Sequence, residues 1–264
     1  MYHTIGIKEF KEDSIMISVK EAFPEYEKPS VAIDVVVTRV VDFPVESNRQ
    51  VAKKGLQVLL ISEKDKKGDN SDKKWHLPGT ILHLGETPKD AIDRIIINKT
   101  NISNAYIEQL YTVADNPLRD DRGHIISIVY TAIVSSNDNI GVVDNSRYDC
   151  KWAWVEKADR NGNRNITLEN GEKLDDLKYD HKYIISDTID RLKNKLMYTD
   201  IGFRFIGEMF TIKELENVFE AINERNIPGF RRIIGNKVVG TGKMSDGKAF
   251  RPAELYIKRG GYSG

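Results

Sequence analysis

The sequence has a single cysteine, Cys150, among its 264 residues. One cysteine excludes an internal disulfide and a cysteine-rich zinc site, and a buried thiol is the expected role of Cys150. The longest apolar runs, such as Val35–Val37 and Val58–Ile61, are far shorter than the ~20 residues that a membrane span needs. The first ten residues show no basic stretch followed by an apolar run, so we expect no signal peptide and a cytoplasmic location.

Net charge is also absent, because 40 basic residues balance 40 acidic ones. The charges are nevertheless spread unevenly: from residue 225 to the end there are nine basic and two acidic residues, a net charge of +7. A basic terminal module on an acidic body is the distribution expected of a nucleic-acid-binding protein. Solvated lysines and arginines without a partner would give the same count, so charge alone does not decide the function.

The length suggests two domains, at roughly 100–200 residues for each. Apolar residues make up 40% of the chain, which suffices for packed cores. Short runs rich in β-branched residues predict buried strands in the first two thirds of the sequence. The expected strands are Val31–Val37, Leu56–Ile61, Tyr111–Val113, Ile125–Val134 and Lys151–Val155, and Ile166–Leu174 is expected to be a hairpin turning at Asn170-Gly171.

Two helices are expected around these strands. Thr87, with Pro88 next to it and Asp90 three positions on, predicts a helix start, and Asn101 is the expected end. Near Leu177 the pattern changes, and Asp180 can cap a long helix with one apolar stripe. We therefore divide the chain into residues 1–177 and residues 178–264, with the long helix as the connector.

The stretch from residue 79 to residue 102 resembles the Nudix box. That box reads Gly, five residues, Glu, seven residues, then Arg-Glu-apolar-any-Glu-Glu-any-Gly-apolar. Glu86 and Arg94 hold the first glutamate and the arginine positions, and Ile102 holds the last apolar one. An accidental match is the alternative, although the strand pattern, the loop and the helix start all agree with the box.

The carboxylates of the box helix are missing. The departures are Thr80 for the first glycine, Ile95 for the first helix glutamate, Asn98 and Lys99 for the glutamate pair, and Asn101 for the second glycine. Nudix hydrolysis uses Mg²⁺, which prefers carboxylate oxygens, and Glu86 alone is a poor magnesium site. We therefore expect no metal, no cofactor and no enzymatic activity. The alternative is a hydrolase that acts on ADP-ribose or a related nucleoside diphosphate through other carboxylates, such as Asp120 or Asp121.

A Nudix fold that has lost its metal-binding carboxylates can still bind a ligand. The loop Pro117–His124 contains two arginines, two acids and a histidine before a strand, and arginine forks suit phosphates. A solvated polar loop is the plainer interpretation, and His124 alone is more often structural. The predicted effector-binding residues are Glu86, Arg94, Arg119, Asp120, Arg122 and His124.

The last part of the chain has the plan of a winged helix-turn-helix. Thr211 and Glu214 form a capping box before a one-sided helix, and the turn 226–229 leads to a short helix, Phe230–Ile234. Phe230, Ile233 and Ile234 are expected on its buried face. Two strands at 237–239 and 253–257 enclose a basic loop, Thr241–Pro252, with Asp246-Gly247 as its turn. In this plan the second helix enters the major groove and the wing contacts phosphates.

The predicted DNA-binding residues are basic and lie in the helices and the wing: Lys213, Arg231, Arg232, Lys243, Lys248 and Arg251. The alternative is a winged helix that binds another protein. In combination, the segments after residue 176 and the Nudix-like part resemble the Nudix-related transcriptional regulators, from about Pro29 to Ile257. That family includes repressors of NAD metabolism and of sugar use.

The resemblance implies a fold and a function. The fold is α/β, a Nudix-type α/β/α sandwich with a mixed sheet, followed by a winged helix-turn-helix domain. The function is that of a homodimeric regulator that binds an operator in double-stranded DNA and senses an ADP-ribose-like nucleotide or a sugar. One departure is Gly229, which precedes Phe-Arg-Arg where members commonly carry asparagine.

Overall fold

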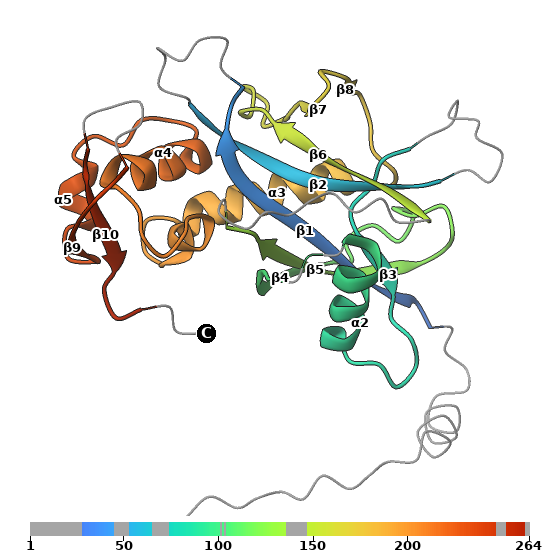
Figure 1. Cartoon of the computed structure of the whole chain (residues 1–264). Helices are drawn as coiled ribbons and strands as arrows, with labels where there is room; N and C mark the ends of the chain where they lie inside the picture. Colours follow the sequence, from blue (N-terminus) through green and yellow to red (C-terminus); the bar gives the residue numbers. More distant parts are fainter. Residues whose placement is uncertain are drawn as a thin grey trace, which may run out of the picture.

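The structure is a computed structural model that describes residues 28–44, 53–64, 74–100, 102, 104–135, 147–246 and 252–261. A mixed sheet forms its centre, and a group of short helices with a two-stranded sheet stands at one end (Figure 1).

In this part of the chain the central sheet has eight strands. They are β1 (Ser30–Asp42), β2 (Lys54–Glu63), β3 (Gly79–Ile81), β4 (Tyr106–Val113), β5 (Ile125–Ile133), β6 (Tyr148–Val155), β7 (Ile166–Leu168) and β8 (Lys173–Leu174). The order is β4-β5-β1-β2-β6-β7-β8, and β3 also pairs with β1. Only the β1–β5 pairing among these is parallel. The expected mixed sheet and each predicted strand of the first part are confirmed.

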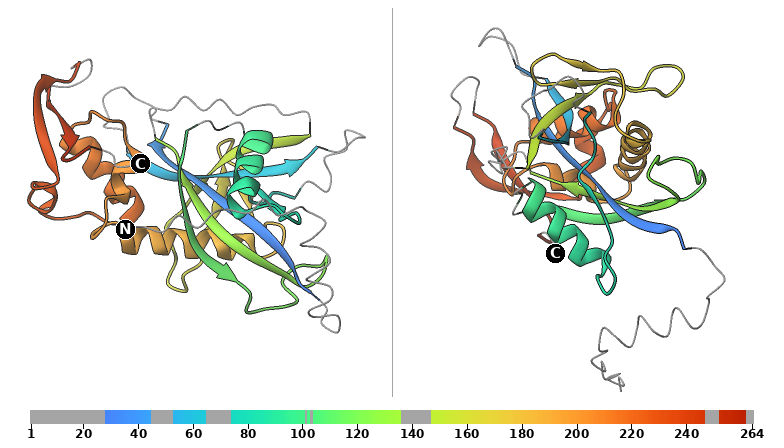
Figure 2. Two further views of the ribbon diagram at one scale, coloured as in Figure 1. Left: turned by 90° about the horizontal axis from the view of Figure 1, so that it is seen from below. Right: turned by 90° about the vertical axis from the view of Figure 1, so that its right-hand side faces the viewer.

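Both faces of this sheet are covered, which explains why its central strands are nearly continuous apolar runs. Ile33 of β1 belongs to a core beneath α2 (Pro88–Ile95). Val36 of the same strand faces the opposite core, which contains α3 (His181–Lys195) and α4 (Ile212–Asn223). The helices therefore lie on both sides of the sheet, as Figure 2 shows, and the expected sandwich is confirmed.

The start of α2 follows the sequence prediction. The Thr87 hydroxyl accepts from the Asp90 N–H at 3.3 Å, and the Asp90 carboxylate accepts from the Thr87 N–H at 3.0 Å. The α-helix ends at Ile95, and a π-helical turn, η1 (Ile96–Thr100), continues it to the residue before the expected end. Asn101 itself lies outside the described residues. Cys150 is buried as expected, and its thiol donates to the Lys99 carbonyl at 3.0 Å.

The hairpin and the long helix are also confirmed, with one correction. Gly171, in the turn between β7 and β8, has a φ of 88°, which glycine adopts without strain. The apolar stripe of α3 is buried, including Ile185, Ile189 and Leu192. Asp180 stands at the N-cap of α3, but its side chain makes no capping hydrogen bond. The carboxylate binds Arg119 instead, a tertiary contact that local sequence does not reveal.

The second module contains η2 (Ile201–Phe205), α4, α5 (Phe230–Ile234), β9 (Val238–Met244) and β10 (Glu254–Lys258). The capping box of α4 is confirmed, since Glu214 N–H donates to the Thr211 hydroxyl at 3.2 Å. The prediction of the buried face of α5 is partly wrong. Phe230 and Ile234 are buried, but Ile233 is 37% exposed. Strand β9 extends to Met244, so the wing loop is shorter than predicted. Gly247, in its expected turn, lies outside the described residues.

None of the helices described here is long and apolar enough to cross a lipid bilayer.

Candidate functional site

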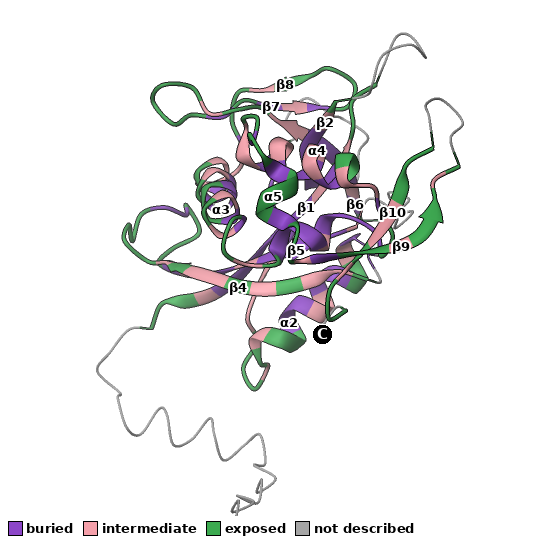
Figure 3. Ribbon diagram, turned by 90° about the vertical axis from the view of Figure 1, so that its left-hand side faces the viewer, coloured by how far each residue is buried: buried purple, intermediate pink, exposed green. Residues whose placement is uncertain are grey.

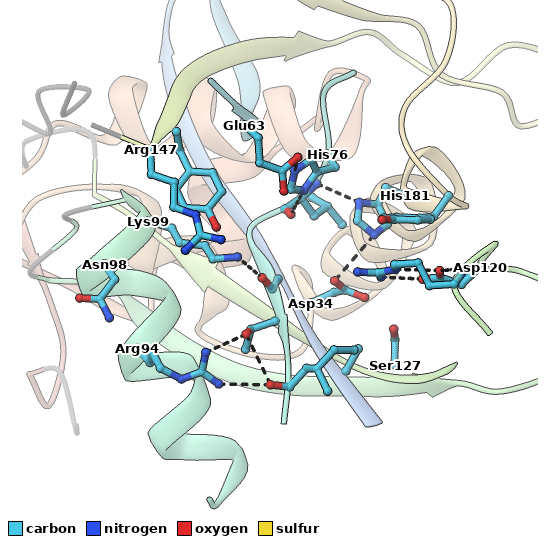
Figure 4. Close-up of a pocket in the computed structure, with 18 of the residues that line it drawn as sticks. Asp34, Glu63, His76, Arg94, Asn98, Lys99, Asp120, Ser127, Arg147 and His181 are labelled. Atoms are coloured by element: carbon cyan, nitrogen blue, oxygen red, sulfur yellow. Dashed lines mark hydrogen bonds and ion pairs between the residues drawn. The ribbon is translucent and has the colours of Figure 1, made fainter. Parts of the chain in front are cut away.

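A cavity of about 570 Å³ opens on the sheet between α2, the loop before β5 and the start of α3 (Figure 4). Its wall is rich in charge. Four predicted effector residues line it: Arg94, Arg119, Asp120 and Arg122. Side chains from distant parts of the chain complete it, among them Asp34, Glu63, His76, Lys99, Tyr148, Tyr179 and His181.

Arg94 of α2 is fixed by the loop before the helix. Its guanidinium donates to both carboxylate oxygens of Glu86, each at 2.8 Å, and to the Thr80 hydroxyl at 2.8 Å. Arg94 and the backbone N–H of His83 lower the pKa of Glu86 to about 2. Glu86 is therefore ionised and bound to an arginine, and it is not among the residues that line the cavity.

The helix positions that hold glutamates in the Nudix box have other roles here. Ile95 is fully buried in the core between α2 and the sheet. Asn98 and Lys99 line the cavity, and the Lys99 ammonium donates to the Gly79 carbonyl at 2.5 Å. Burial lowers the pKa of Lys99 to about 8. An alkyl group, an amide and an ammonium do not fit a magnesium ion, which requires oxygen ligands that carry negative charge.

The loop before β5 turns one arginine inward and leaves a second at the rim. Arg119 donates to the two carboxylate oxygens of Asp180 at 2.7 and 2.5 Å, and to the Ser127 hydroxyl at 2.7 Å. Arg122 donates to Asp120 at 2.9 and 2.6 Å and lies 4.4 Å from the centre of the Tyr179 ring. Arg119 and Asp120 are thus buried in this network, whereas the other residues of the loop are exposed.

His124 is the predicted effector residue that lies apart from this network. It lines a separate hollow beside Arg122 and the start of β1, and it does not line the main cavity. With Glu86 behind Arg94, two of the six predicted residues therefore stand outside the cavity wall.

Sequence reasoning missed a buried polar cluster at the back of the cavity (Figure 4). His181 is 4% exposed, its Nδ1 accepts from the Leu77 N–H at 2.9 Å, and its Nε2 lies 3.7 Å from Asp34. Burial lowers the pKa of His181 to about 4, so the ring is neutral. His76 lies beside it, with ring centres 6.1 Å apart. One signal was available: Asp34 interrupts the apolar run of β1, and a buried carboxylate needs a partner.

The predicted DNA-binding residues that the structure describes lie on the surface of the second module (Figure 3). Arg231 and Arg232 are exposed on α5, and Lys243 is exposed on β9. Lys213, also exposed on α4, donates to Glu216 at 2.8 Å. Lys248 and Arg251 fall outside the described residues, so their placement stays a prediction.

Gly229 sets the start of α5. Its φ of 70° lies in the left-handed region, which glycine adopts freely and asparagine tolerates better than other residues. The departure from asparagine therefore preserves the backbone conformation that places Arg231 and Arg232 outward.

Comparisons with known proteins agree with this architecture. Residues 46–172 match the NUDIX domain, and residues 202–257 match the NrtR DNA-binding winged helix domain. An ADPR responsive transcriptional repressor, NtrR of Acinetobacter baylyi, is 28% identical over 239 residues, which cover 88% of this chain and 83% of the repressor. The chain therefore carries a NUDIX domain followed by an NrtR-type winged helix domain, and it is homologous to the NrtR and NtrR transcriptional repressors.

The chain is also similar to a second DNA-binding regulator and to an enzyme. NrtR of Shewanella oneidensis, crystallised with a 27mer DNA, is 26% identical with a TM-score of 0.61, and the match covers 87% of this chain and 93% of that one. An ADP-ribose pyrophosphatase of Methanocaldococcus jannaschii is 30% identical over 169 residues, or 64% of this chain and 78% of the enzyme. The predicted fold and the predicted class of DNA-binding regulator are thereby confirmed.

Proposed function

We propose that this regulator binds an ADP-ribose-like nucleotide in the cavity and operator DNA through its winged helix, and that the two events are coupled. One observation carries the proposal. Tyr179 and His181, at the start of α3, line the cavity, while Lys193 near the other end of α3 binds Glu224, the C-cap of α4, at 2.9 Å. A ligand that contacts the start of α3 can therefore act on α4, a helix of the DNA-binding module.

A diphosphate suits this cavity better than an uncharged sugar. Arg94, Lys99 and Arg122 bring three cationic groups to its wall, and such groups form strong charge-assisted hydrogen bonds with phosphates. The Tyr148 and Tyr179 rings offer flat surfaces beside them. The names of two relatives, an ADPR responsive repressor and an ADP-ribose pyrophosphatase, point to the same class of ligand.

We also propose that the domain does not hydrolyse its ligand. The support is chemical: Ile95 is buried, Lys99 brings a positive charge, and Glu86 is held by Arg94. Removing metal-bound carboxylates from phosphoryl chemistry costs several kcal/mol of transition-state stabilisation. The similarity to a pyrophosphatase makes hydrolysis of ADP-ribose the rival function.

The organisation of the regulator follows from the same reasoning. We divide it near Leu177 into an effector module, residues 1–177, and a DNA-binding module, residues 178–264; the two family matches leave residues 173–201 between them. A homodimer in the cytoplasm would present two winged helices to two half-sites of an operator. Arg231 and Arg232 would contact bases or phosphates there, with Lys213, Lys243, Lys248 and Arg251 on the backbone.

Fluorescence anisotropy with a labelled duplex taken from upstream of the chain's own operon tests the proposal. We expect binding that weakens steeply with salt and a Kd that ADP-ribose changes at least fivefold. The double variant Arg231→Ala/Arg232→Ala should lose DNA binding and keep ADP-ribose binding, whereas Lys89→Ala, on exposed α2, should change neither. An unchanged DNA affinity with saturating ADP-ribose would contradict the coupling.

Hydrolysis is tested by incubating a high concentration of the protein with ADP-ribose and Mg²⁺. We expect no release of AMP over hours. Turnover that depends on Mg²⁺ would establish the rival function.

A further inference from the structure

Lys99 differs from three other cations of the cavity, Arg94, Arg119 and Arg122, because no neighbouring acid neutralises its charge. Arg94, Arg119 and Arg122 each form an ion pair with a carboxylate, at 2.5–2.8 Å. No carboxylate among the residues with described positions lies within 4.0 Å of the Lys99 ammonium. Its contacts are the Gly79 carbonyl at 2.5 Å and the Tyr148 ring, whose centre is 4.9 Å away.

An ammonium has three N–H donors, and the Gly79 carbonyl uses one of them. The side chain is half-buried and lines the same cavity as Arg94 (Figure 4). Burying a charged group without a counter-ion is unfavourable, so an anionic ligand at this point would stabilise the protonated lysine.

Four charged groups act on Lys99 from the surrounding elements. Glu63 of β2 and Asp34 of β1 favour the protonated amine, whereas Arg147 before β6 and Arg94 of α2 disfavour it. Burial outweighs all of them and lowers the pKa of Lys99 to about 8. The amine is therefore mostly protonated at pH 7 in the empty cavity, and a bound phosphate would hold it protonated at higher pH.

We propose that Lys99 binds the diphosphate of the ligand directly and takes the place of a divalent cation, so that this cavity binds nucleoside diphosphates without metal. This proposal rests on the proposed function and adds which group recognises the diphosphate. The ammonium is covalently held at the π-helical turn that follows α2, so its charge is present before the ligand arrives. A dication next to it would meet repulsion from Lys99 and Arg94 rather than ligands.

The test is isothermal titration calorimetry with two probes, ADP-ribose and inorganic pyrophosphate, in EDTA and in Mg²⁺. We expect ADP-ribose to bind in EDTA with a Kd within about threefold of the value in Mg²⁺. Lys99→Met should weaken binding by roughly 10- to 100-fold, the range for losing a hydrogen bond to a charged group. Lys99→Arg should recover part of the loss, and Lys89→Met, on the outer face of α2, should bind as the wild type does.

A pH series gives a second readout. Between pH 8 and pH 9.5 the affinity of the wild type should fall, by at most about tenfold per pH unit, because binding then requires uptake of one proton. Lys99→Met should lack this decrease. A purely structural lysine would give neither the pH dependence nor its loss.

The outcomes separate the two proposals. If ADP-ribose does not bind but pyrophosphate does, and Lys99→Met removes that binding, the choice of effector is wrong and the role of Lys99 holds. A strict requirement for Mg²⁺, or wild-type affinity in Lys99→Met, overturns the role of Lys99 while leaving effector binding intact. If neither probe binds the wild type, both proposals fail.

Discussion

At the scale of single residues, the Arg119–Asp180 pair connects the wall of the effector cavity to the start of α3. The Arg119 side chain is 3% exposed and that of Asp180 is 23% exposed, so water screens the pair little. Asp180 occupies the N-cap of α3 but contributes its carboxylate to Arg119 rather than to the helix. The pair therefore fixes the start of α3 against the loop before β5.

Replacing Arg119 by methionine should lower the free energy of unfolding by about 3 kcal/mol, because the carboxylate of Asp180 loses its partner in a poorly solvated place. The double variant Arg119→Met/Asp180→Asn should lose less stability, since neither position then carries a charge without a partner. Urea unfolding of the three proteins measures both values. A single variant within about 0.5 kcal/mol of the wild type would show that the pair adds little.

His181 predicts how stability depends on pH. Burial lowers its pKa to about 4 in the folded protein, against about 6.5 in an unfolded chain. As the pH falls below about 6.5 the unfolded chain takes up the proton first, so stability is complete above that pH and is lost toward pH 4. The loss is at most about 1.4 kcal/mol per pH unit.

Urea unfolding at pH 7 and pH 5 should therefore give a decrease of up to about 2 kcal/mol from this residue. His181→Gln should show a smaller decrease between the same two pH values. If that variant does not fold, NMR titration of the wild-type ring decides the matter. A ring that is already half protonated at pH 6 would be incompatible with its burial.

At the scale of secondary-structure elements, the sequence predicted correctly the features that depend on neighbouring residues. It did not predict those that depend on contacts between distant residues. Both capping boxes, at Thr87 and Thr211, form as predicted because the donor and acceptor lie three residues apart. Asp180 does not cap α3, and Ile233 is exposed, because distant residues decide both outcomes. The cavity shows the same limit: Arg94 and Arg122 were found by motif and loop, whereas His181 reaches Asp34 from 147 positions away.

The start of α5 gives a prediction at this scale. Gly229 has a φ of 70°, and an added Cβ would meet only the Arg232 guanidinium, at 3.9 Å. Gly229→Asn should therefore be tolerated, whereas Gly229→Val should cost about 1–2 kcal/mol from backbone conformation alone. Because α5 carries Arg231 and Arg232, Val should also weaken operator binding more than Asn does. Thermal unfolding and DNA anisotropy of both variants make the comparison, and equal behaviour would contradict the conformational argument.

At the scale of the whole molecule, the two modules share one core. Val58 and Leu60 of the central sheet lie in the same apolar cluster as Phe219 and Phe230 of the winged helix. Ion pairs border this core: Arg164, 3% exposed and just before β7, binds Asp190 of α3 at 2.6 Å and also binds Glu224, the C-cap of α4. The effector module, the connecting helix and the DNA-binding module therefore meet at one group of charges. The sequence indicates two domains but not this contact, which depends on chain segments far apart.

Glu224 allows that contact to be removed without disturbing the backbone. It is a C-cap with a φ of 63°, a conformation that glycine prefers, so Glu224→Gly should keep the backbone conformation while Arg164 and Lys193 lose a partner. We expect ADP-ribose and DNA each to bind with nearly wild-type affinity when alone, and the effect of ADP-ribose on the Kd for DNA to fall below about twofold. Glu216→Gln, which removes only an exposed pair with Lys213 on α4, is the matched control. Full coupling in Glu224→Gly would mean that the signal passes instead through the apolar core between α3 and α4.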